Sequence, residues 1–506
     1  MKNIIALDIG TSSTLAALYR DDGAILYSSG EEYHSIFPKP FCVEHEPLTW
    51  ALAAEHTLRD VAEYIKKNGL SAEGIAVTSQ RSSLIPVDAE GNALRNAIMW
   101  QDKRTISECD TLRSKYGMQE LHKRTGLRIN PFFVLPKILW LRHNENEIYQ
   151  KAHKFIGVQD YVVHHLTEHF VTDWTQASRT MLMDLETFKW DDELLSAAGI
   201  TADRLCELIP PGDEAAGLSK KMAEKTGLPE GLPVIISGGD QQNAAVALGV
   251  VEPGVAEANT GTGSFVISYA DKPIFDDECR VVCQASAIPG KWIVEAGIFN
   301  TGAIFRWFKE QCCSDICGKD SPYVIMCDEA AASPIGASGV ILLPHFEGSA
   351  APYWDPISKG VFFNLSLGTR RADMLRAILE GISMEIADNL ELIQKLVGRV
   401  DTVSVAGGMT RSDLFCNIQA NTYARNVKRY RNPEQSSLGA SMVAAPALGV
   451  YGSIVEAFQK MSSPEFSLFG PEQSDVEKYR LHRERKRRLY YALHDSNVFT
   501  DCVERE

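Results

Sequence analysis

The chain has 506 residues, 45% of them hydrophobic and 23% charged, with a formal net charge of −15 at pH 7; this length predicts two or more domains, and the negative charge argues against a general nucleic-acid-binding protein. No segment approaches the roughly 18 consecutive apolar residues of a membrane span, and residues 1–7 lack the layout of a signal peptide. Eleven cysteines without framework spacing favour reduced thiols, so we expect a cytoplasmic protein with neither a nucleic-acid nor a membrane partner.

The first segment, residues 4–19, is predicted to form two strands joined by a polar turn. Three hydroxyl side chains lie in this turn, those of Thr11, Ser12 and Ser13, and such residues can bring backbone amides and Oγ atoms close to phosphate oxygens. Asp8, at the end of the first strand, could hold a magnesium ion through water. Glycine and threonine are also common in hairpins for reasons of turn chemistry alone, so both interpretations stay open.

Two polar clusters follow in the next part of the chain. Residues 50–67 have the apolar spacing of an amphipathic helix, and a strand predicted at 74–78 leads into the cluster that contains Arg81. A second cluster, which includes Trp100, follows a further hairpin. An arginine donates hydrogen bonds in a fixed fork and a tryptophan offers a flat apolar wall, a pairing suited to a hydroxylated substrate. The alternative is a surface arginine and a core tryptophan.

The strongest single signal is Asp240. An apolar run at 233–236 predicts a short buried strand, two glycines then allow a tight turn, and Asp240 precedes an alanine-rich helix. A carboxylate at this junction lies where open α/β sheets place ligands, at the carboxyl ends of strands. The alternative is a helix N-cap, because an aspartate at a helix start satisfies orphan amides in any protein. Strands alternate with helices up to this point, which indicates a mixed α/β domain.

The second half of the chain begins like the first. Residues 254–267 repeat the pattern of strand, Gly-Thr turn and strand, which suggests duplicated domains that face each other across a cleft. Gly261 and Thr262 could wrap phosphate oxygens, although an ordinary glycine-rich hairpin has the same composition. A helix predicted at 304–310 could favour an anion at its N-terminus. A strand predicted at 401–406 runs into two glycines that permit the close approach of a flat ring or a ribose.

Two long helices complete the predicted elements. Residues 373–396 have good helix propensity. The last helix, around 476–493, is rich in lysine and arginine. We interpret its basic residues as a solvated face, with apolar positions such as Leu481 and Leu489 covered beneath it.

These segments, in this order, resemble the FGGY family of carbohydrate kinases over essentially the whole chain. One family signature is present at 360–365 and 373–380, with Asn364 where the family usually has glycine, and a looser one lies at 137–140. The resemblance implies an α/β fold of the actin-like ATPase (ribonuclease H-like) type, in which two domains with duplicated mixed sheets flank a cleft. It also implies ATP and Mg²⁺ as cofactors.

By this resemblance, residues 1–247 carry the substrate and the catalytic base, and residues 248–506 bind the nucleotide. Asp240 would be the catalytic base, and Asp8 and Asp240 the carboxylates associated with magnesium. The nucleotide-binding positions that carry over are Thr11, Ser12, Ser13, Gly261, Thr262, Gly302, Arg306, Gly408 and Ser412. The substrate-binding positions are Arg81, Ser82, Trp100, Phe132, Asp240, Gln241 and Phe265.

The substrate implied is a small sugar that receives phosphate on a primary hydroxyl. The residues around Arg81 resemble glycerol kinases, but Ser82 stands where these normally have glutamate, and Phe132 where they place a substrate-facing tyrosine. Losing two polar contacts costs discrimination for a small triol. The loop at 351–356 looks equally like xylulokinases, although their typical Met-His pair is missing. We therefore predict a ketose such as xylulose or a related polyol, with glycerol as the alternative.

Three further expectations concern class and assembly. A protein of the same fold that binds nucleotide and sugar without catalysis is the alternative from another class, and it is disfavoured because all the proposed catalytic positions are filled. A Rossmann dehydrogenase is disfavoured because no Gly-x-Gly-x-x-Gly follows the first strand. Members of the resembled family are often dimers, so the resemblance implies a homodimer.

Overall fold

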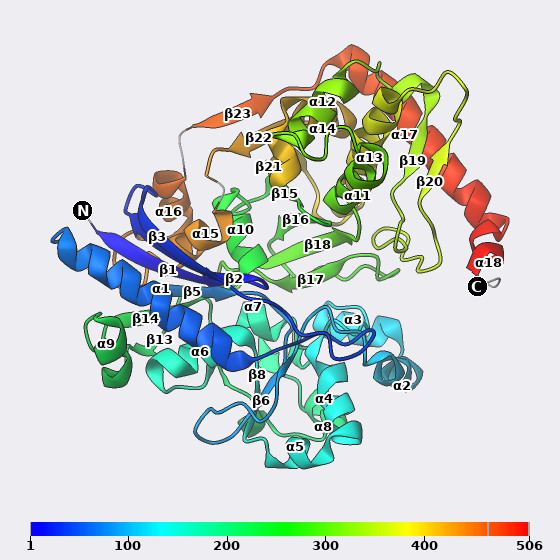
Figure 1. The fold of residues 1–506 in the computed structure, drawn as a ribbon. Coiled ribbons are helices and arrows are strands. Elements are labelled where there is room, and N and C mark those ends of the chain that lie inside the picture. The colour runs from blue at the N-terminus through cyan, green and yellow to red at the C-terminus, as the bar shows by residue number, and fades with distance from the viewer. Residues whose placement is uncertain (1, 433, 463–464, 504–506) are drawn as a thin grey trace. The chain divides into compact units, whose positions relative to one another are not determined.

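The computed structural model describes residues 2–432, 434–462 and 465–503. Within it the chain divides into two compact units, each built on a twisted sheet with helices packed against it (Figure 1). Unit 1 comprises residues 1–251, 270–293 and 434–463, and unit 2 comprises residues 252–269, 294–433 and 464–506. Two segments of unit 1 are therefore separated in sequence from the rest of it.

Unit 1 is built on a six-stranded mixed sheet. In spatial order its strands are β13 (Glu214–Gly217), β14 (Pro233–Gly239), β5 (Ile75–Ser79), β1 (Asn3–Ile9), β2 (Ser13–Arg20) and β3 (Ile25–Glu32). The predicted hairpin of β1 and β2 is confirmed, and β14, β5 and β1 run parallel to one another. These three strands are nearly continuous apolar runs, because helices cover both faces of the sheet.

Alternate residues of β1 point to opposite faces of this sheet. Ile5 and Leu7 belong to one apolar core, together with Trp50, whereas Ile4 and Ala6 belong to another. The first core is covered by α1 (Pro47–Lys67), α6 (Val158–Thr167) and α9 (Lys220–Thr226). The second is covered by α10 (Asp240–Ala247), α15 (Gln435–Ala444) and α16 (Ile454–Met461). Helix α15, although late in the chain, packs on α10.

The other elements of unit 1 include a group of helices with a core of its own. The remaining helices are α2 (Ile106–Tyr116), α3 (Met118–Thr125), α4 (Val134–Asn144), α5 (Asn146–Lys151), α7 (Trp174–Ala177), α8 (Asp192–Ala198) and η1 (Ala202–Arg204). The short strands are β4 (Glu44–His45), β6 (Ile85–Val87), β7 (Ala97–Ile98), β8 (Lys154–Ile156), β9 (Val171–Asp173), β10 (Met183–Asp184), β11 (Lys189–Trp190), β12 (Glu207–Ile209) and, in segment 270–293, β17 (Val282–Ala285).

The sheet of unit 2 repeats the plan of the first. The strands of this sheet lie in the order β17, β18 (Trp292–Ile298), β16 (Ser264–Ala270), β15 (Gly254–Thr260), β21 (Val400–Ala406), β22 (Asn426–Tyr430) and β23 (Phe466–Phe469). Strand β15 is antiparallel to β16 and parallel to β21, just as β1 is antiparallel to β2 and parallel to β5. The α/β fold class with duplicated mixed sheets, predicted from the two Gly-Thr hairpins, is therefore confirmed.

In unit 2, α12 (Pro322–Ala331) and α14 (Asp413–Tyr423) pack on the long helix α13 (Arg371–Val397). The remaining elements are α11 (Gly302–Cys312), η2 (Ala337–Gly339), β19 (Ile341–Leu343), β20 (Val361–Phe363), η3 (Gly408–Arg411), α17 (Gln473–Asp495) and α18 (Val498–Val503). Among the described residues, no helix combines the length and the apolar character needed to span a membrane.

The basic helix α17 is confirmed, but one of its expected apolar contacts is wrong. Leu489 packs against an apolar cluster, whereas Leu481 is 43% exposed. A lysine is buried instead: Lys486 is paired with Glu385 and with Asp388, at 3.2 Å from Asp388 Oδ2, both on α13. The basic residues of α17 therefore do not all form a solvated face, because carboxylates of α13 neutralise part of them in the interior.

Candidate functional site

Three neighbouring parallel strands end at the same edge of the unit 1 sheet. In the register of this sheet, Asp8 of β1 pairs with Thr78 of β5, and Thr78 pairs with Gly238 of β14. The Thr78 hydroxyl donates to the Gly238 carbonyl oxygen at 2.7 Å, which ties the two strand ends together. Ligands bind at the carboxyl ends of strands in open α/β sheets. The register therefore gathers Asp8, Arg81, which follows β5, and Asp240, which follows β14.

Asp240 is the first residue of α10, not its N-cap. The cap position belongs to Gly239, and Asp240 Oδ1 accepts a hydrogen bond from the amide of Gln241, which is itself half-buried, at 2.7 Å. Arg81 Nε lies 3.6 Å from Asp240 Oδ1, and the two side chains are 6% and 25% exposed. Asp240 is therefore not the N-cap residue, although its carboxylate accepts one of the first amides of α10. A buried guanidinium lies beside this carboxylate, which remains open to solvent.

Gly239 allows Arg81 to approach the start of α10. A Cβ atom at position 239 would lie 2.5 Å from Arg81 Cδ and 2.7 Å from Gln242 Oε1, closer than side-chain atoms pack. The Gly239 amide donates to Thr175 Oγ1 at 2.8 Å, and the Thr175 amide donates in turn to Asp173 Oδ1 at 2.7 Å. The end of β14 is thus fixed by buried polar contacts while its glycine leaves room for the arginine.

Asp8 lies among other carboxylates. Burial, together with the negative charges of Asp240 and Glu434, raises the pKa of Asp8 from its ordinary 3.8 to about 8. A bound cation would favour the charged form of such a group. Within the described residues, no cluster of three or more histidine, cysteine or acidic side chains is arranged to hold a metal ion by itself.

The turn between β1 and β2 lies beside the second polar cluster. Trp100 Nε1 donates to Thr11 Oγ1 at 3.1 Å, and the rings of Trp100 and Phe132 meet edge to face with centroids 6.1 Å apart. Ser12 is exposed and Ser13 half-buried. Trp100 and Phe132 are also half-buried, so the alternative of a core tryptophan does not hold. The structure brings the first hairpin and two predicted substrate positions together.

Lys137 ties two predicted substrate positions to each other. Its Nζ donates to the carbonyl oxygens of Ser82 at 2.6 Å and of Phe132 at 2.7 Å. Ser82 is buried in a left-handed conformation with φ of 68°, and its hydroxyl accepts a hydrogen bond from Arg179 Nε at 3.2 Å. The roles of Lys137 and Arg179 were missed from the sequence, because their contacts with Ser82 join segments that are far apart in the chain.

Unit 2 contains a cavity of about 800 Å³, within the range of small-molecule sites. It is lined by the turn between β15 and β16, the start of α11, helix α12 and the junction of β21 with α14. All six nucleotide-binding positions predicted in this half of the chain line it: Gly261, Thr262, Gly302, Arg306, Gly408 and Ser412.

The start of α11 holds the turn between β15 and β16. The amides of Gly302 and Ala303 donate to the carbonyl oxygens of Gly261 and Thr262 at 3.0 and 3.1 Å, and Arg306 Nη2 donates to Thr262 Oγ1 at 3.3 Å. A Cβ atom at Gly302 would lie 2.3 Å from the Gly261 carbonyl oxygen. The first amides of α11, which we expected to favour an anion, are therefore engaged by the turn.

Helix α12 supplies lining residues that were missed from the sequence. Tyr323, Val324 and Cys327 line the cavity, and Tyr323 stacks on Phe305 of α11 with ring centroids 5.9 Å apart. No motif in the sequence linked α12 to the hairpin or to the glycine junction. Phe265, a predicted substrate residue, lies on β16 and is not among the residues that line this cavity.

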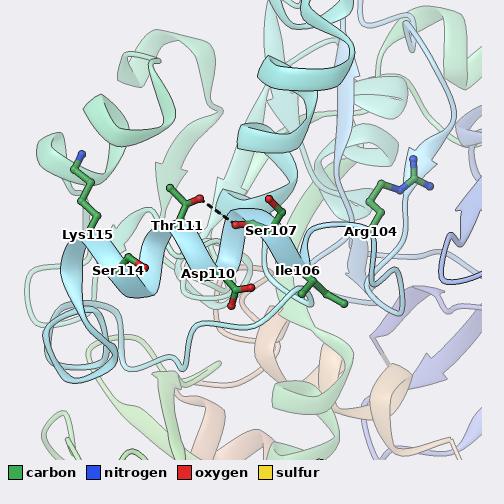
Figure 2. Close-up of a pocket in the computed structure, with 7 residues that line it drawn as sticks. All are labelled: Arg104, Ile106, Ser107, Asp110, Thr111, Ser114 and Lys115. Carbon is green, nitrogen blue, oxygen red and sulfur yellow. Dashed lines mark hydrogen bonds between the residues drawn. The ribbon is translucent and has the colours of Figure 1, made fainter. Parts of the chain in front are cut away.

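A second hollow, of about 930 Å³, opens along the exposed face of α2 in unit 1 (Figure 2). None of the predicted site residues line it. Two of its polar groups make contacts within the helix: the Thr111 hydroxyl donates to the Ser107 carbonyl oxygen at 3.0 Å, and Asp110 pairs with Arg113 at 2.5 Å. We therefore take this hollow as a solvated helix face and not as the functional site.

Comparison with known protein families decides the class. Residues 3–247 match the family model described as the N-terminal domain of the FGGY family of carbohydrate kinases, and residues 256–448 match the model of its C-terminal domain. The chain belongs to the FGGY family of carbohydrate kinases. The resemblance predicted from the motifs is confirmed, and the protein is a carbohydrate kinase.

Relatives of this FGGY kinase differ in substrate. A glycerol kinase of Rhodopirellula baltica is 31% identical, and the match covers 89% of this chain and 84% of the relative. A xylulose kinase of Bacillus subtilis is 27% identical, with 98% of each chain covered. The solved structure of a ligand-bound xylulose kinase from Lactobacillus acidophilus has a TM-score of 0.91 at 24% identity, covering 98% of this chain and 99% of that one. The predicted actin-like ATPase fold is confirmed.

The pH dependence of stability tests whether Lys137 is neutral in the folded kinase. Burial lowers the pKa of Lys137 to about 7, against about 10.4 for an unfolded lysine. Between these values the unfolded chain binds more protons at this site than the folded chain, so the contribution of Lys137 to the free energy of unfolding rises with pH. In urea titrations, we expect the free energy of unfolding of the wild type to rise relative to that of Lys137→Met between pH about 7 and pH about 10.

The matched control is Lys151→Met, which removes an exposed lysine of α5. The free energy of unfolding of this control is measured at each pH beside that of the wild type and of Lys137→Met. A difference between the wild type and Lys137→Met that does not change with pH would show that Lys137 stays protonated in the folded state, against the expectation.

Proposed function

We propose that this kinase transfers the γ-phosphoryl group of ATP to a primary hydroxyl of a ketose, such as xylulose, or of a related polyol. The observation that carries this proposal is the strand register that gathers Asp8, Arg81 and Asp240 at one edge of the unit 1 sheet. Phosphoryl transfer needs little covalent chemistry from a protein. It needs a positioned hydroxyl, a charge-neutralised triphosphate and a group that accepts the hydroxyl proton.

Asp240 is the proposed catalytic base. Its carboxylate stands at the end of a central strand, open to solvent on one side, and can accept a proton from a sugar hydroxyl. Arg81 is the proposed partner of the substrate, because its guanidinium reaches the same point and can donate to a sugar oxygen in a fixed geometry. Two further substrate contacts are proposed. One is Gln241, which follows Asp240 in the chain, and the other is Trp100, which contacts Thr11 in the turn of the first hairpin.

Asp8 and Asp240 are proposed to hold Mg²⁺. The residues present fit this ion, since Mg²⁺ is usually held by one or two carboxylates together with substrate phosphates, without a cage made only of protein groups. The carboxylate charges that raise the pKa of Asp8 are those that a divalent cation would balance. When bound, the ion neutralises charge on the phosphates.

The cavity of unit 2 is the proposed ATP site. Its wall at Thr262 and Arg306 supplies a hydroxyl and a guanidinium for phosphate oxygens, and Gly408 with Ser412 would border the adenosine. Thr11, Ser12 and Ser13 are proposed to contact phosphates from unit 1. The division of substrate and nucleotide between residues 1–247 and 248–506 is part of the same proposal.

Two positions favour a ketose or larger polyol over glycerol. The Ser82 hydroxyl accepts a hydrogen bond from Arg179. The ring of Phe132 packs against Trp100 and lacks the hydroxyl that a tyrosine would supply at this position. A site that recognises a small triol depends on polar partners for its hydroxyls, so the lack of a carboxylate and a phenol weakens glycerol binding. Glycerol kinase stays the second candidate, because a glycerol kinase is 31% identical to this chain.

Release of ADP in the presence of Mg-ATP tests this function. The panel consists of ketopentoses, deoxyketohexoses, tetritols, aldonates and glycerol. We expect ADP release that depends on added sugar, strongest with one ketose or polyol and weak with glycerol. Glycerol as the best substrate would contradict the argument from Ser82 and Phe132. The absence of sugar-dependent release with every compound would contradict the proposed reaction.

The role of the unit 2 cavity predicts a selective effect of Gly302→Ala. The added Cβ atom would meet the Gly261 carbonyl oxygen and displace the hairpin that lines the cavity. We expect the KM for ATP to rise about tenfold or more, as for the loss of about 1.4 kcal/mol of binding, while the KM for the sugar stays unchanged. Gly318→Ala is the matched control, because a Cβ atom there meets nothing within 4 Å. An unchanged KM for ATP in Gly302→Ala would contradict the assignment.

A further inference from the structure

One segment of unit 1 reaches the proposed substrate site from a distant part of the chain. Residues 270–293 join unit 1 after the first two strands of unit 2, and they dock on the end of α3. The Cys283 amide donates to the Gly126 carbonyl oxygen at 2.9 Å, and the Asp276 amide donates to His122 Nε2 at 3.2 Å. These contacts fix β17, and with it the side chain of Gln284, relative to the substrate residues of the same unit.

Gln284 is completely buried and contacts the arginine beside the proposed base. Its Oε1 accepts hydrogen bonds from Arg81 Nη1 at 2.9 Å and from Gln242 Nε2 at 3.3 Å. Arg81 Nη1 also donates to Gln242 Oε1 at 3.1 Å, while Arg81 Nε faces Asp240. Two glutamine amides therefore hold one end of the guanidinium, and Asp240 lies near the other.

The orientation of the Gln284 amide follows from these contacts. A flipped amide would place its nitrogen against two donors, so Oε1 must face Arg81 and Gln242, and Nε2 must point away from them. Within the described part of the chain, Nε2 is buried and has no hydrogen-bond partner. Burying an amide donor without an acceptor is unfavourable, and such groups in folded proteins are rare. Gln241 Oε1, next to the proposed base, is unpaired in the same way.

We propose that Gln284 is a specificity-determining residue, whose Oε1 holds Arg81 and whose Nε2 donates to an oxygen of the bound substrate. The recognised oxygen belongs to a carbon other than the one that is phosphorylated, because Asp240 serves the reacting hydroxyl. Gln284 thereby selects a polyhydroxy or keto substrate that carries an acceptor at this position. This inference rests on the proposed sugar kinase activity, which it deepens.

Two substitutions separate the two functions of the side chain. Gln284→Glu keeps an oxygen acceptor for Arg81 and Gln242 but removes the donor, and Gln284→Leu removes both. The control is Gln150→Leu, an exposed glutamine of α5. For each variant, thermal unfolding establishes that the protein is folded, and kcat and KM are measured for ATP and for the best sugar of the panel. Monodeoxy analogues of that sugar are measured in parallel.

We expect Gln284→Glu to raise the KM for the sugar about tenfold, as the loss of one hydrogen bond would do. Gln284→Leu should raise this KM further, because Arg81 also loses an acceptor, and the KM for ATP should stay unchanged in both variants. One deoxy analogue should be a poor substrate of the wild type. Its kcat/KM should fall no further in Gln284→Glu, because its missing oxygen is the one that Nε2 contacts. If Gln284→Leu does not fold, Gln284→Glu alone decides.

Two results would overturn the inference, and they are distinguishable. Suppose that the wild type phosphorylates a sugar, and that the Gln284 variants have the same KM for that sugar and discriminate against every deoxy analogue as strongly as the wild type does. Then Nε2 does not contact the substrate. If the wild type releases no ADP in response to any sugar, then the proposed function fails, and the inference that rests on it fails too.

Discussion

The pairing of three parallel strands is the constraint on which the rest of the site depends. Because Asp8, Thr78 and Gly238 lie side by side in β1, β5 and β14, the chain after each strand leaves the sheet at the same place. Asp240 and Arg81 owe their proximity to this register. A register shift of one residue would turn every side chain of a strand to the opposite face of the sheet. Because helices pack on both faces, the packing that fixes this register also fixes the positions of Asp8, Arg81 and Asp240.

Support for these groups comes from segments that lie far from them in sequence. Lys137 holds the Ser82 and Phe132 carbonyls, and Gln284 reaches Arg81 from a segment that follows the first hairpin of unit 2. The Arg81 guanidinium is therefore fixed by buried hydrogen bonds, and a side chain held in this way needs little reorganisation when it acts. Unit 2 follows the same logic, since the start of α11 fixes the turn that lines its cavity.

The parts of this account that could be predicted are those encoded locally. The strand, glycine turn and helix around Asp240 follow from a few adjacent residues, and so do both Gly-Thr hairpins. Contacts between distant segments leave no such signal: Gln284 carries no motif, and the ring of Tyr323 enters the cavity only because α12 packs beside α11. The prediction that Leu481 is covered was wrong. Periodicity alone did not reveal that Lys486 of the same helix would be buried, paired with acidic residues of α13.

The measurement that tests the central claim most directly is single-turnover phosphoryl transfer by Asp240→Asn, with sugar binding measured by calorimetry on the same variant. If Asp240 is the base, transfer should fall by a factor of about 10² to 10⁴, the usual contribution of general base catalysis, while sugar affinity stays close to that of the wild type. Asp110→Asn, in the α2 hollow, should change neither quantity. Transfer by Asp240→Asn at the wild-type rate would contradict the account.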